Sequence, residues 1–240
     1  MIDIISKFLF AIPLAVAPCI AIVFFIYFRD KYEKEPYKLL RNSYLLGMLC
    51  IIPAIIIEEI FIWMGVDDNK GLLTTLIFAF LVVGLNEEVC KFTILRTFAF
   101  PKKDFNEPFD GIVYSVMISM GFATVENIIY SLSLGVESSL LRMFTAVPLH
   151  AVCAIFMGFF VGKAKFSQNK MLNYFYGITI ATLVHGLYDF FLFQKNNAAL
   201  AILSFVVLGA SIAITFLAIN HHQKKSPFNP HRAENNSQGL

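Results

Sequence analysis

Long apolar runs separated by short polar segments dominate the chain. Seven of these runs are long enough to cross a bilayer, because a helix needs ~20 residues to span the hydrocarbon. They cover residues 8–28, 39–64, 72–99, 111–134, 143–162, 172–193 and 197–219. A hydrophobic share of 58% and a mean hydropathy of +0.68 exclude a soluble domain. The sequence therefore predicts an all-α, polytopic transmembrane helical bundle of about seven spans.

Basic residues are distributed unevenly between the two ends of these runs. Of the 19 lysines and arginines, 14 follow the first, third, fifth and seventh runs, and four lie on the other side. Because positive residues favour the cytoplasmic side, this split predicts an N-terminus outside and a C-terminus in the cytoplasm. The net charge of +2 requires no anionic partner such as a nucleic acid. We expect a multi-pass protein of the cell membrane.

The polar segments are too short to hold a separate soluble domain. Residues 1–220 are expected to form one transmembrane bundle, and residues 221–240 are expected to form a disordered cytoplasmic tail because they are polar and contain proline and asparagine. The tail histidines, His221, His222 and His231, are expected to be exposed to solvent rather than to bind a metal. Any catalytic site must therefore lie within the membrane.

Three ionisable residues, Glu87, Glu88 and Lys91, lie where the third apolar run should meet hydrocarbon. One such side chain near the bilayer centre costs ~2.5–3.5 kcal/mol on insertion scales, so three require compensation. Glu87 and Lys91 share a helix face, so the lysine can neutralise one carboxylate while Glu88 points about 100° away. A buried ion pair that only sets helix packing is the alternative.

A second acidic pair, Glu58 and Glu59, lies in the second run, one or two turns from its outer end and close to Trp63. Carboxylates near the interface can reach water, so their burial is less costly than that of the first pair. The sequence favours a structural or substrate-entry role for this pair over catalysis.

Polar side chains also occur inside the next three runs. The fourth run contains Glu126 and Asn127. The fifth contains His150, on a strip of small residues that predicts close helix packing and directs the imidazole into the bundle. The sixth contains His185 and Asp189, four residues apart, so the carboxylate can fix the imidazole tautomer. A lone buried histidine is usually a core residue, but beside acids at membrane depth a functional role is favoured.

The depths of these residues are similar. With a rise of 1.5 Å per residue, Glu126, His150 and His185 each lie ~12 Å below the outer ends of their helices. Glu87 lies about two turns deeper by the same measure. We nevertheless expect these side chains to meet in one water-holding chamber.

Three motifs occur in this order along the chain and together resemble one family. They are Glu87-Glu88-x-x-Lys91, Phe109-Asp110-Gly111-Ile112-Val113-Tyr114 and Gly121-Phe122-Ala123-x-x-Glu126-Asn127. The pattern resembles the PrsW family of intramembrane proteases, which is related to the CAAX prenyl endopeptidases and bacteriocin-processing proteases. The resemblance implies a membrane endopeptidase of the bacterial plasma membrane. It also implies a membrane-embedded substrate, such as a single-span anti-sigma factor.

The chemistry expected from these residues is hydrolysis by an activated water. The sequence contains no Gly-x-Ser-x-Gly elbow and no His-Glu-x-x-His zinc signature, which leaves carboxylates and imidazoles. The resemblance implies that Glu87, or its neighbour Glu88, is the general base, with His150 relaying the proton. His185, oriented by Asp189, would donate to the oxyanion. The residues expected in supporting roles are Lys91, Glu126 and Asn127.

Three alternatives remain open at this stage. The favoured hypothesis is catalysis without a cofactor, but Glu126, His150, His185 and Asp189 form a plausible zinc-ligand set. A proton-coupled transporter could also use intramembrane acids and histidines, although the sequence shows none of the internal repeats that such a protein would predict. A scaffold that only retains buried ion pairs is the third possibility.

Overall fold

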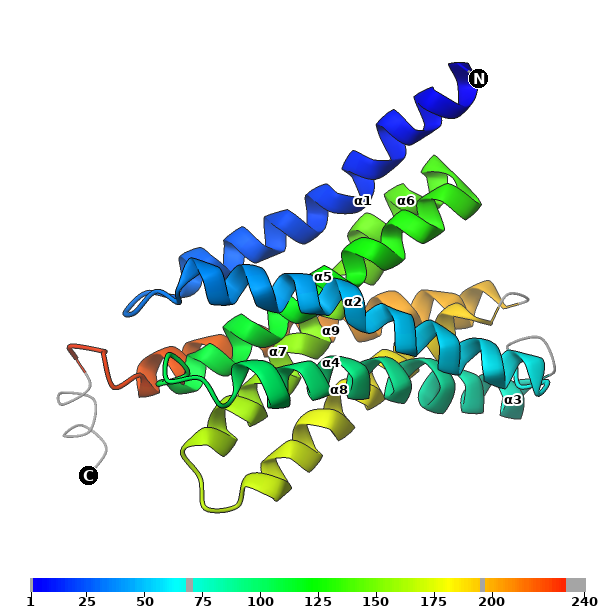
Figure 1. Cartoon of the computed structure of the whole chain (residues 1–240). Coiled ribbons are helices and arrows are strands. Elements are labelled where there is room, and N and C mark those ends of the chain that lie inside the picture. Colours follow the sequence, from blue (N-terminus) through cyan, green and yellow to red (C-terminus); the bar gives the residue numbers. More distant parts are fainter. Residues whose placement is uncertain (1, 68–70, 195–196, 232–240) are drawn as a thin grey trace.

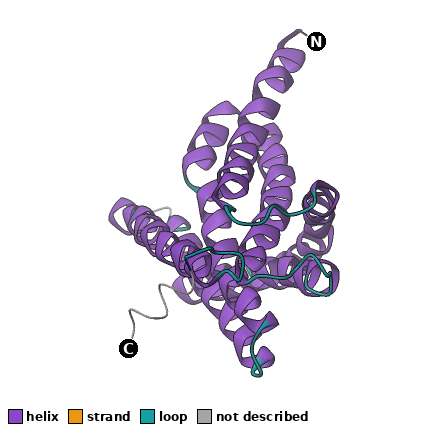
Figure 2. Ribbon diagram, turned by 90° about the vertical axis from the view of Figure 1, so that its left-hand side faces the viewer, coloured by secondary structure: helices purple, strands orange, loops and turns teal. Residues whose placement is uncertain are grey.

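In the computed structural model, residues 2–67, 71–194 and 197–231 are described, although the side chains of residues 2–11 and 198 are not. Every regular element in these ranges is a helix (Figures 1 and 2). The helices are α1 (Ile2–Arg29), α2 (Tyr37–Trp63), α3 (Leu72–Ile77), η1 (Phe78–Leu85), α4 (Asn86–Ile94), η2 (Leu95–Ala99), α5 (Pro108–Leu134), α6 (Val136–Phe144), α7 (Ala146–Lys165), α8 (Lys170–Leu192) and α9 (Ala198–Lys225). The predicted all-α fold is confirmed.

Seven helical segments of the described chain are long and apolar enough to cross a membrane, as the sequence predicts. The third is one continuous helix over residues 72–99 in which α-helix and π-helix alternate. The fifth differs from the expected run over residues 143–162, because residues 136–144 form the separate short helix α6. The chain leaves helical geometry at Thr145, and α7 then begins with Pro148 in its first turn. Proline is tolerated there because its missing N–H would have no helical partner.

The central helix of the bundle is α5, which packs against α1, α2 and α7. Its residues from 109 to 124 are all buried. Glycine permits this packing, since a side chain at Gly121 would collide with the backbone of Tyr44 in α2, and one at Gly111 would collide with that of Gly158 in α7. Figure 1 shows α1 and α5 crossing α2 and α4 obliquely.

Asp110, within the second sequence motif, caps the start of α5. Its carboxylate accepts hydrogen bonds from the backbone N–H groups of Asn106 (2.7 Å) and Glu107 (2.8 Å). These are amides that the helix itself leaves unpaired. Glu126 lies ~24 Å further along the same helix. The motif therefore closes one end of the bundle and is remote from the predicted site.

Other buried carboxyl groups join separate segments at this end, which the charge pattern predicts to face the cytoplasm. The Tyr114 hydroxyl donates to Glu35 in the loop between α1 and α2, and the Ser226 hydroxyl donates to Glu107. Burial, reinforced by the nearby Asp110 carboxyl, raises the pKa of Glu35 to about 11, so this group is protonated at neutral pH. These hydrogen bonds thus tie the loop before α2 and the end of α9 to the start of α5.

The C-terminal helix extends beyond the expected start of the tail at residue 221. Helix α9 runs to Lys225, and His222 is 2% exposed, with its Nε2 donating to the carbonyl of Phe159 (2.8 Å). His222 therefore contributes to packing between α7 and α9, contrary to the expectation that it is exposed. Residues 232–240 lie outside the described ranges, so the disorder of the tail stays a prediction.

Candidate active site

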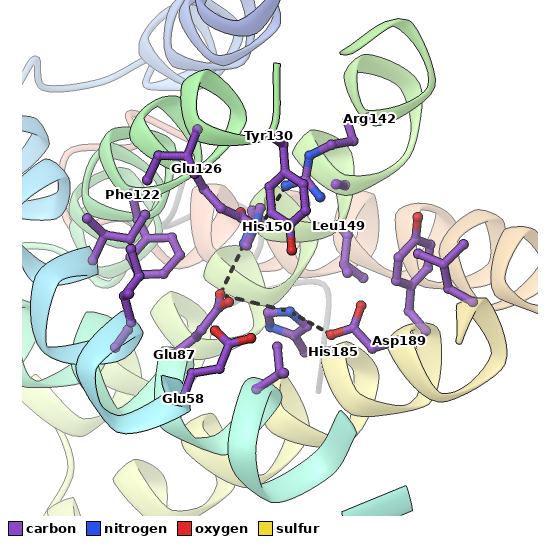
Figure 3. A pocket seen from close by; sticks show the side chains of 18 of the residues that line it. Glu58, Glu87, Phe122, Glu126, Tyr130, Arg142, Leu149, His150, His185 and Asp189 are labelled. Atoms are coloured by element: carbon purple, nitrogen blue, oxygen red, sulfur yellow. Dashed lines mark hydrogen bonds and ion pairs between the residues drawn. The ribbon is translucent and has the colours of Figure 1, made fainter. Parts of the chain in front are cut away.

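A cavity of about 390 Å³ lies between α2, η1 and α4 on one side and α5, α6, α7 and α8 on the other. Its apolar walls carry an unusual number of polar groups. The polar lining residues are Glu58, Glu59, Glu87, Glu126, Tyr130, Arg142, His150, His185, Tyr188 and Asp189. Figure 3 shows Glu87, His150 and His185 pointing toward one another. The predicted meeting of these side chains in one cavity is confirmed.

Glu87 and Glu88 share a single counter-ion. The ammonium of Lys91 donates to Glu87 Oε2 (3.0 Å) and to Glu88 Oε1 (2.9 Å). Lys91 therefore bridges both carboxylates, whereas the sequence predicted that it would neutralise only one. Glu88 is fully buried, while Glu87 is 7% exposed and lines the cavity. Of the two acids, it is thus Glu87 that can reach a water molecule or a substrate.

His150 connects this pair to α5. Its Nε2 lies 2.6 Å from Glu126 Oε2, and its Nδ1 lies 3.1 Å from the ammonium of Lys91. Because an ammonium can only donate, Nδ1 accepts and Nε2 carries the proton, which makes this imidazole neutral. Ser119 donates to the backbone carbonyl of His150 (2.9 Å) and fixes α7 against α5.

His185 lies between two carboxylates. Its Nδ1 is 3.0 Å from Glu88 Oε1, and its Nε2 is 3.3 Å from Asp189 Oδ2. The predicted contact with Asp189, one turn along α8, is therefore present. Since both ring nitrogens face acceptors, the arrangement suits an imidazole that can donate from both atoms. The two imidazole rings are perpendicular, with centroids 5.4 Å apart.

Glu87 was expected to lie about two turns deeper than Glu126, His150 and His185. In the structure its side chain nevertheless lies close to those of the two histidines. The π-helix η1 precedes Glu87 and places more residues in each turn than an α-helix does, and the helices cross obliquely. Glycines bring η1 directly against α8: a Cβ at Gly84 would lie 3.2 Å from the backbone nitrogen of Gly186. This contact places Glu88 beside His185, the residue before Gly186.

Four donors converge closely enough to hold a metal ion. Ligand atoms of Glu87, Glu88, His150 and His185 all lie within 4.8 Å of one another, a property that no other group of described residues shares. Glu88 Oε2 is buried and has no hydrogen-bond partner, which leaves it free to ligate. Nitrogen and carboxylate oxygen donors suit zinc, so the residues present fit such an ion.

The predicted zinc-ligand set differs from this group in two members. The predicted set contains Glu126 and Asp189 where the observed group contains Glu87 and Glu88. In the structure, Glu126 contacts Nε2 of His150 and Asp189 contacts Nε2 of His185, so each lies behind an imidazole. Carboxylates in that position orient a histidine and fix its tautomer. Their placement favours a supporting role for both.

Arg142 is a residue that the sequence analysis did not assign to the site. From α6, its Nη2 lies 2.7 Å from Glu126 Oε1, and its Nε donates to Asn127 Oδ1 (2.8 Å). The guanidinium also lies over the Tyr130 ring, 3.9 Å from its centroid. Glu126 therefore bridges Arg142 and His150, while Asn127 holds the arginine. The sequence did contain a signal for Arg142, because it is one of only four basic residues on the side of the membrane predicted to face outward.

Comparisons with known proteins point to one family. A family model described as PrsW family intramembrane metalloprotease matches residues 35–219. Protease PrsW of Geobacillus kaustophilus is 36% identical over 183 residues, which cover 76% of this chain and 79% of the relative. Protease PrsW of Bacillus subtilis is 35% identical over 194 residues, with 80% and 87% covered, and that of Clostridioides difficile is 33% identical over 202 residues, with 81% and 84% covered. No solved structure matches. With seven membrane-spanning segments and a buried Glu/His site, the chain is a multi-pass membrane peptidase and belongs to the PrsW family of intramembrane metalloproteases.

Proposed function

We propose that this peptidase cleaves its membrane-protein substrate with a water molecule that Glu87 activates. One observation carries the proposal: Glu87 Oε2 faces the cavity and lies 4.0 Å from His150 Nδ1 and 3.9 Å from His185 Nε2. These separations are too long for direct hydrogen bonds, and a general base can act through one bridging water. The attacking water would occupy this space.

Each polar group then has a role in hydrolysis. Glu87 accepts a proton as the water oxygen attacks the scissile carbonyl carbon, and it returns that proton to the departing amine. His185 donates to the oxyanion that forms, while Asp189 holds its ring in place. Lys91 donates a hydrogen bond to Glu87 Oε2 and orients that carboxylate. His150, fixed by its contact with Glu126, shares that proton while Glu87 holds it.

A metal ion would leave Glu87 as the base but give His150 and His185 the role of ligands. Glu88, His150 and His185 are the three most buried donors of the four-residue group, at 0%, 2% and 3% exposure, and would serve as ligands. Glu87 would then remain available as the base. A divalent ion held there would supply Lewis-acid charge near the scissile carbonyl. Metal analysis of the purified protein, together with cleavage before and after chelation and re-addition of zinc, tests this arrangement.

The experiment that tests the proposed function compares the wild type with Glu87→Gln and Glu88→Gln. Each protein is reconstituted with candidate single-span membrane proteins, and cleavage products are identified by mass spectrometry. Glu87→Gln should abolish cleavage, because the amide cannot accept the proton, while the protein remains folded. Normal cleavage by Glu87→Gln would remove its role as the base.

The substrate proposed on the basis of the family resemblance is a single-span anti-sigma factor. The relatives named above are bacterial proteins, which supports a location in the bacterial plasma membrane. Membership of a peptidase family leaves proton-coupled transport, the alternative that intramembrane acids suggested, without support.

A further inference from the structure

Glu58 is a carboxylate of the cavity wall that the proposed reaction does not use. It lies on α2 and lines the cavity together with Glu87. Figure 3 shows its side chain on the same side of the cavity as Glu87 and across the cavity from Arg142. Glu58 is only partly buried, so its oxygens can be reached from inside the cavity. It lies ~8 Å, or five residues, from the end of α2 at Trp63.

Three other carboxylates of the cavity each have a basic partner. Glu87 pairs with Lys91 at 3.0 Å, Glu126 with Arg142 at 2.7 Å, and Asp189 with His185 at 3.3 Å. The first two partners are fixed cations, and both are already engaged.

Glu58 differs from these acids, because no ion pair or hydrogen bond to its side chain is found in the described part of the chain. The charges that act on it most strongly come from other carboxylates, Glu87 first and Glu126 next. An unpaired carboxylate at this depth is unfavourable, and acids within membrane spans usually pair or mark a substrate path. Since no cation of the described residues pairs with Glu58, a cation from a ligand would be bound there.

The surroundings of Glu58 suit a long basic side chain. Ile55 lies one turn before Glu58 on α2, and Leu192 lies across the cavity on α8; both are apolar lining residues. Lysine and arginine bury their aliphatic stems along such surfaces while the charged end reaches a polar partner. Long lysine and arginine side chains near the ends of membrane helices reach toward the interface in this way.

We propose that Glu58 selects substrates that carry a lysine or arginine close to the scissile bond. The basic side chain would lie along the apolar wall and form an ion pair with the Glu58 carboxylate, while Glu87 acts on the neighbouring carbonyl. This inference rests on the proposed function, because it assigns the substrate class of the same cavity. It gives the second acidic pair of the sequence a role in recognition rather than in bond cleavage.

The test uses purified protein in nanodiscs and a panel of synthetic single-span peptides. The peptides differ at one position near the cleaved bond, which carries Lys, Arg, Gln or Glu. Since a hydrogen bond to a charged group contributes ~1.5–3 kcal/mol, the wild type should cleave the Lys and Arg peptides with a kcat/KM roughly 10- to 100-fold above that for Gln. Glu58→Gln should remove this preference and leave cleavage of the Gln peptide within about threefold of the wild type.

Charge reversal gives the sharper result. Glu58→Lys should prefer the Glu peptide over the Lys peptide, which a loss of folding could not produce. Glu137→Gln is the matched control, because it removes the same charge from an exposed residue of α6 that does not line the cavity, and it should keep the preference for Lys.

Two outcomes separate this inference from the proposed function. If the wild type cleaves the whole panel without regard to charge, or if Glu58→Gln keeps the preference, the inference is overturned and the proposed function stands. If the wild type cleaves no peptide and no candidate membrane protein, the proposed function fails, and the inference fails with it.

Discussion

Replacing Lys91 with methionine tests whether the buried charges of the site balance one another. The ammonium lies within 3.1 Å of acceptor atoms on Glu87, Glu88 and His150, and 4.3 Å from the centroid of the Phe122 ring. It is 2% exposed, so water cannot replace it. Methionine fills most of the same volume without the charge. The substitution therefore leaves two carboxylates with one cation fewer.

The expected loss of stability follows from these contacts. Removing one partner of a buried ion pair costs ~3–5 kcal/mol, because the other charge remains desolvated. Glu88 keeps its contact with His185 at 3.0 Å, which places the estimate at the low end of that range, ~3 kcal/mol. For a chain of this size, ~1 kcal/mol shifts the Tm by ~2–4 °C, so Lys91→Met should melt ~6–12 °C below the wild type.

Differential scanning fluorimetry in detergent measures this shift. The control is Lys103→Met, which removes a lysine from the exposed loop before α5 and should leave the Tm unchanged. Adding Glu88→Gln to Lys91→Met removes one of the two stranded charges and should restore at least half of the lost stability. A Lys91→Met protein that melts within ~2 °C of the wild type would refute the view that Lys91 holds the acids in place.

Three other predictions follow from the geometry. Asp189→Asn should lower kcat ~10- to 100-fold in the peptide cleavage assay with little change in Tm, because the ring of His185 loses its orienting carboxylate. Arg142→Leu should lower the Tm by the equivalent of ~1–3 kcal/mol, since Glu126 loses its charged partner; an unchanged Tm would mean that this ion pair contributes nothing. Burial, with the nearby Glu107 carboxyl, raises the pKa of Asp30 from 3.8 to about 7, so the folded protein holds a proton that the unfolded chain releases, and stability falls as the pH rises through that range. Asp30→Asn should therefore raise the Tm at pH 8, by the equivalent of at most ~4 kcal/mol, and change it little at pH 4; an equal effect at both pH values would contradict this.

The number of spans and the grouping of Glu87, His150 and His185 could be predicted from the sequence for one physical reason. Polar side chains inside apolar runs must face protein or water, and few such side chains occur, so those on different helices are expected to meet. The same reasoning placed Asp189 beside His185, because both lie on one helix and helical spacing fixes their relation.

Other features depend on tertiary geometry that helical spacing does not contain. Lys91 also contacts His150 of α7, a partner that a single-helix projection cannot show, whereas its contacts with Glu88 (i, i+3) and Glu87 (i, i+4) follow from helical spacing. Arg142 was counted with the loop charges, because the predicted fifth run begins at residue 143 and the short helix α6 before it was not predicted. The observed group of metal-binding donors also differs from the predicted set. Which carboxylate faces which nitrogen of His185 depends on the packing of α4 against α8, and helical spacing does not contain that information.

The geometry required for the reaction depends on two glycines that carry no chemistry. A side chain at Gly186 would meet the ring of Phe80 at 2.6 Å, and one at Gly84 would meet backbone atoms at 3.0–3.3 Å, so any larger residue separates η1 from α8. Glu87 Oε2 is already 3.9 Å from His185 Nε2. One further ångström would misplace the two groups relative to the water and the scissile carbonyl, and a displacement of that size can lower the rate ~100-fold. Because this gap is set by helix packing, Gly186→Ala should lower kcat even though no catalytic group is altered, and cleavage at the wild-type rate would show that the gap is not critical.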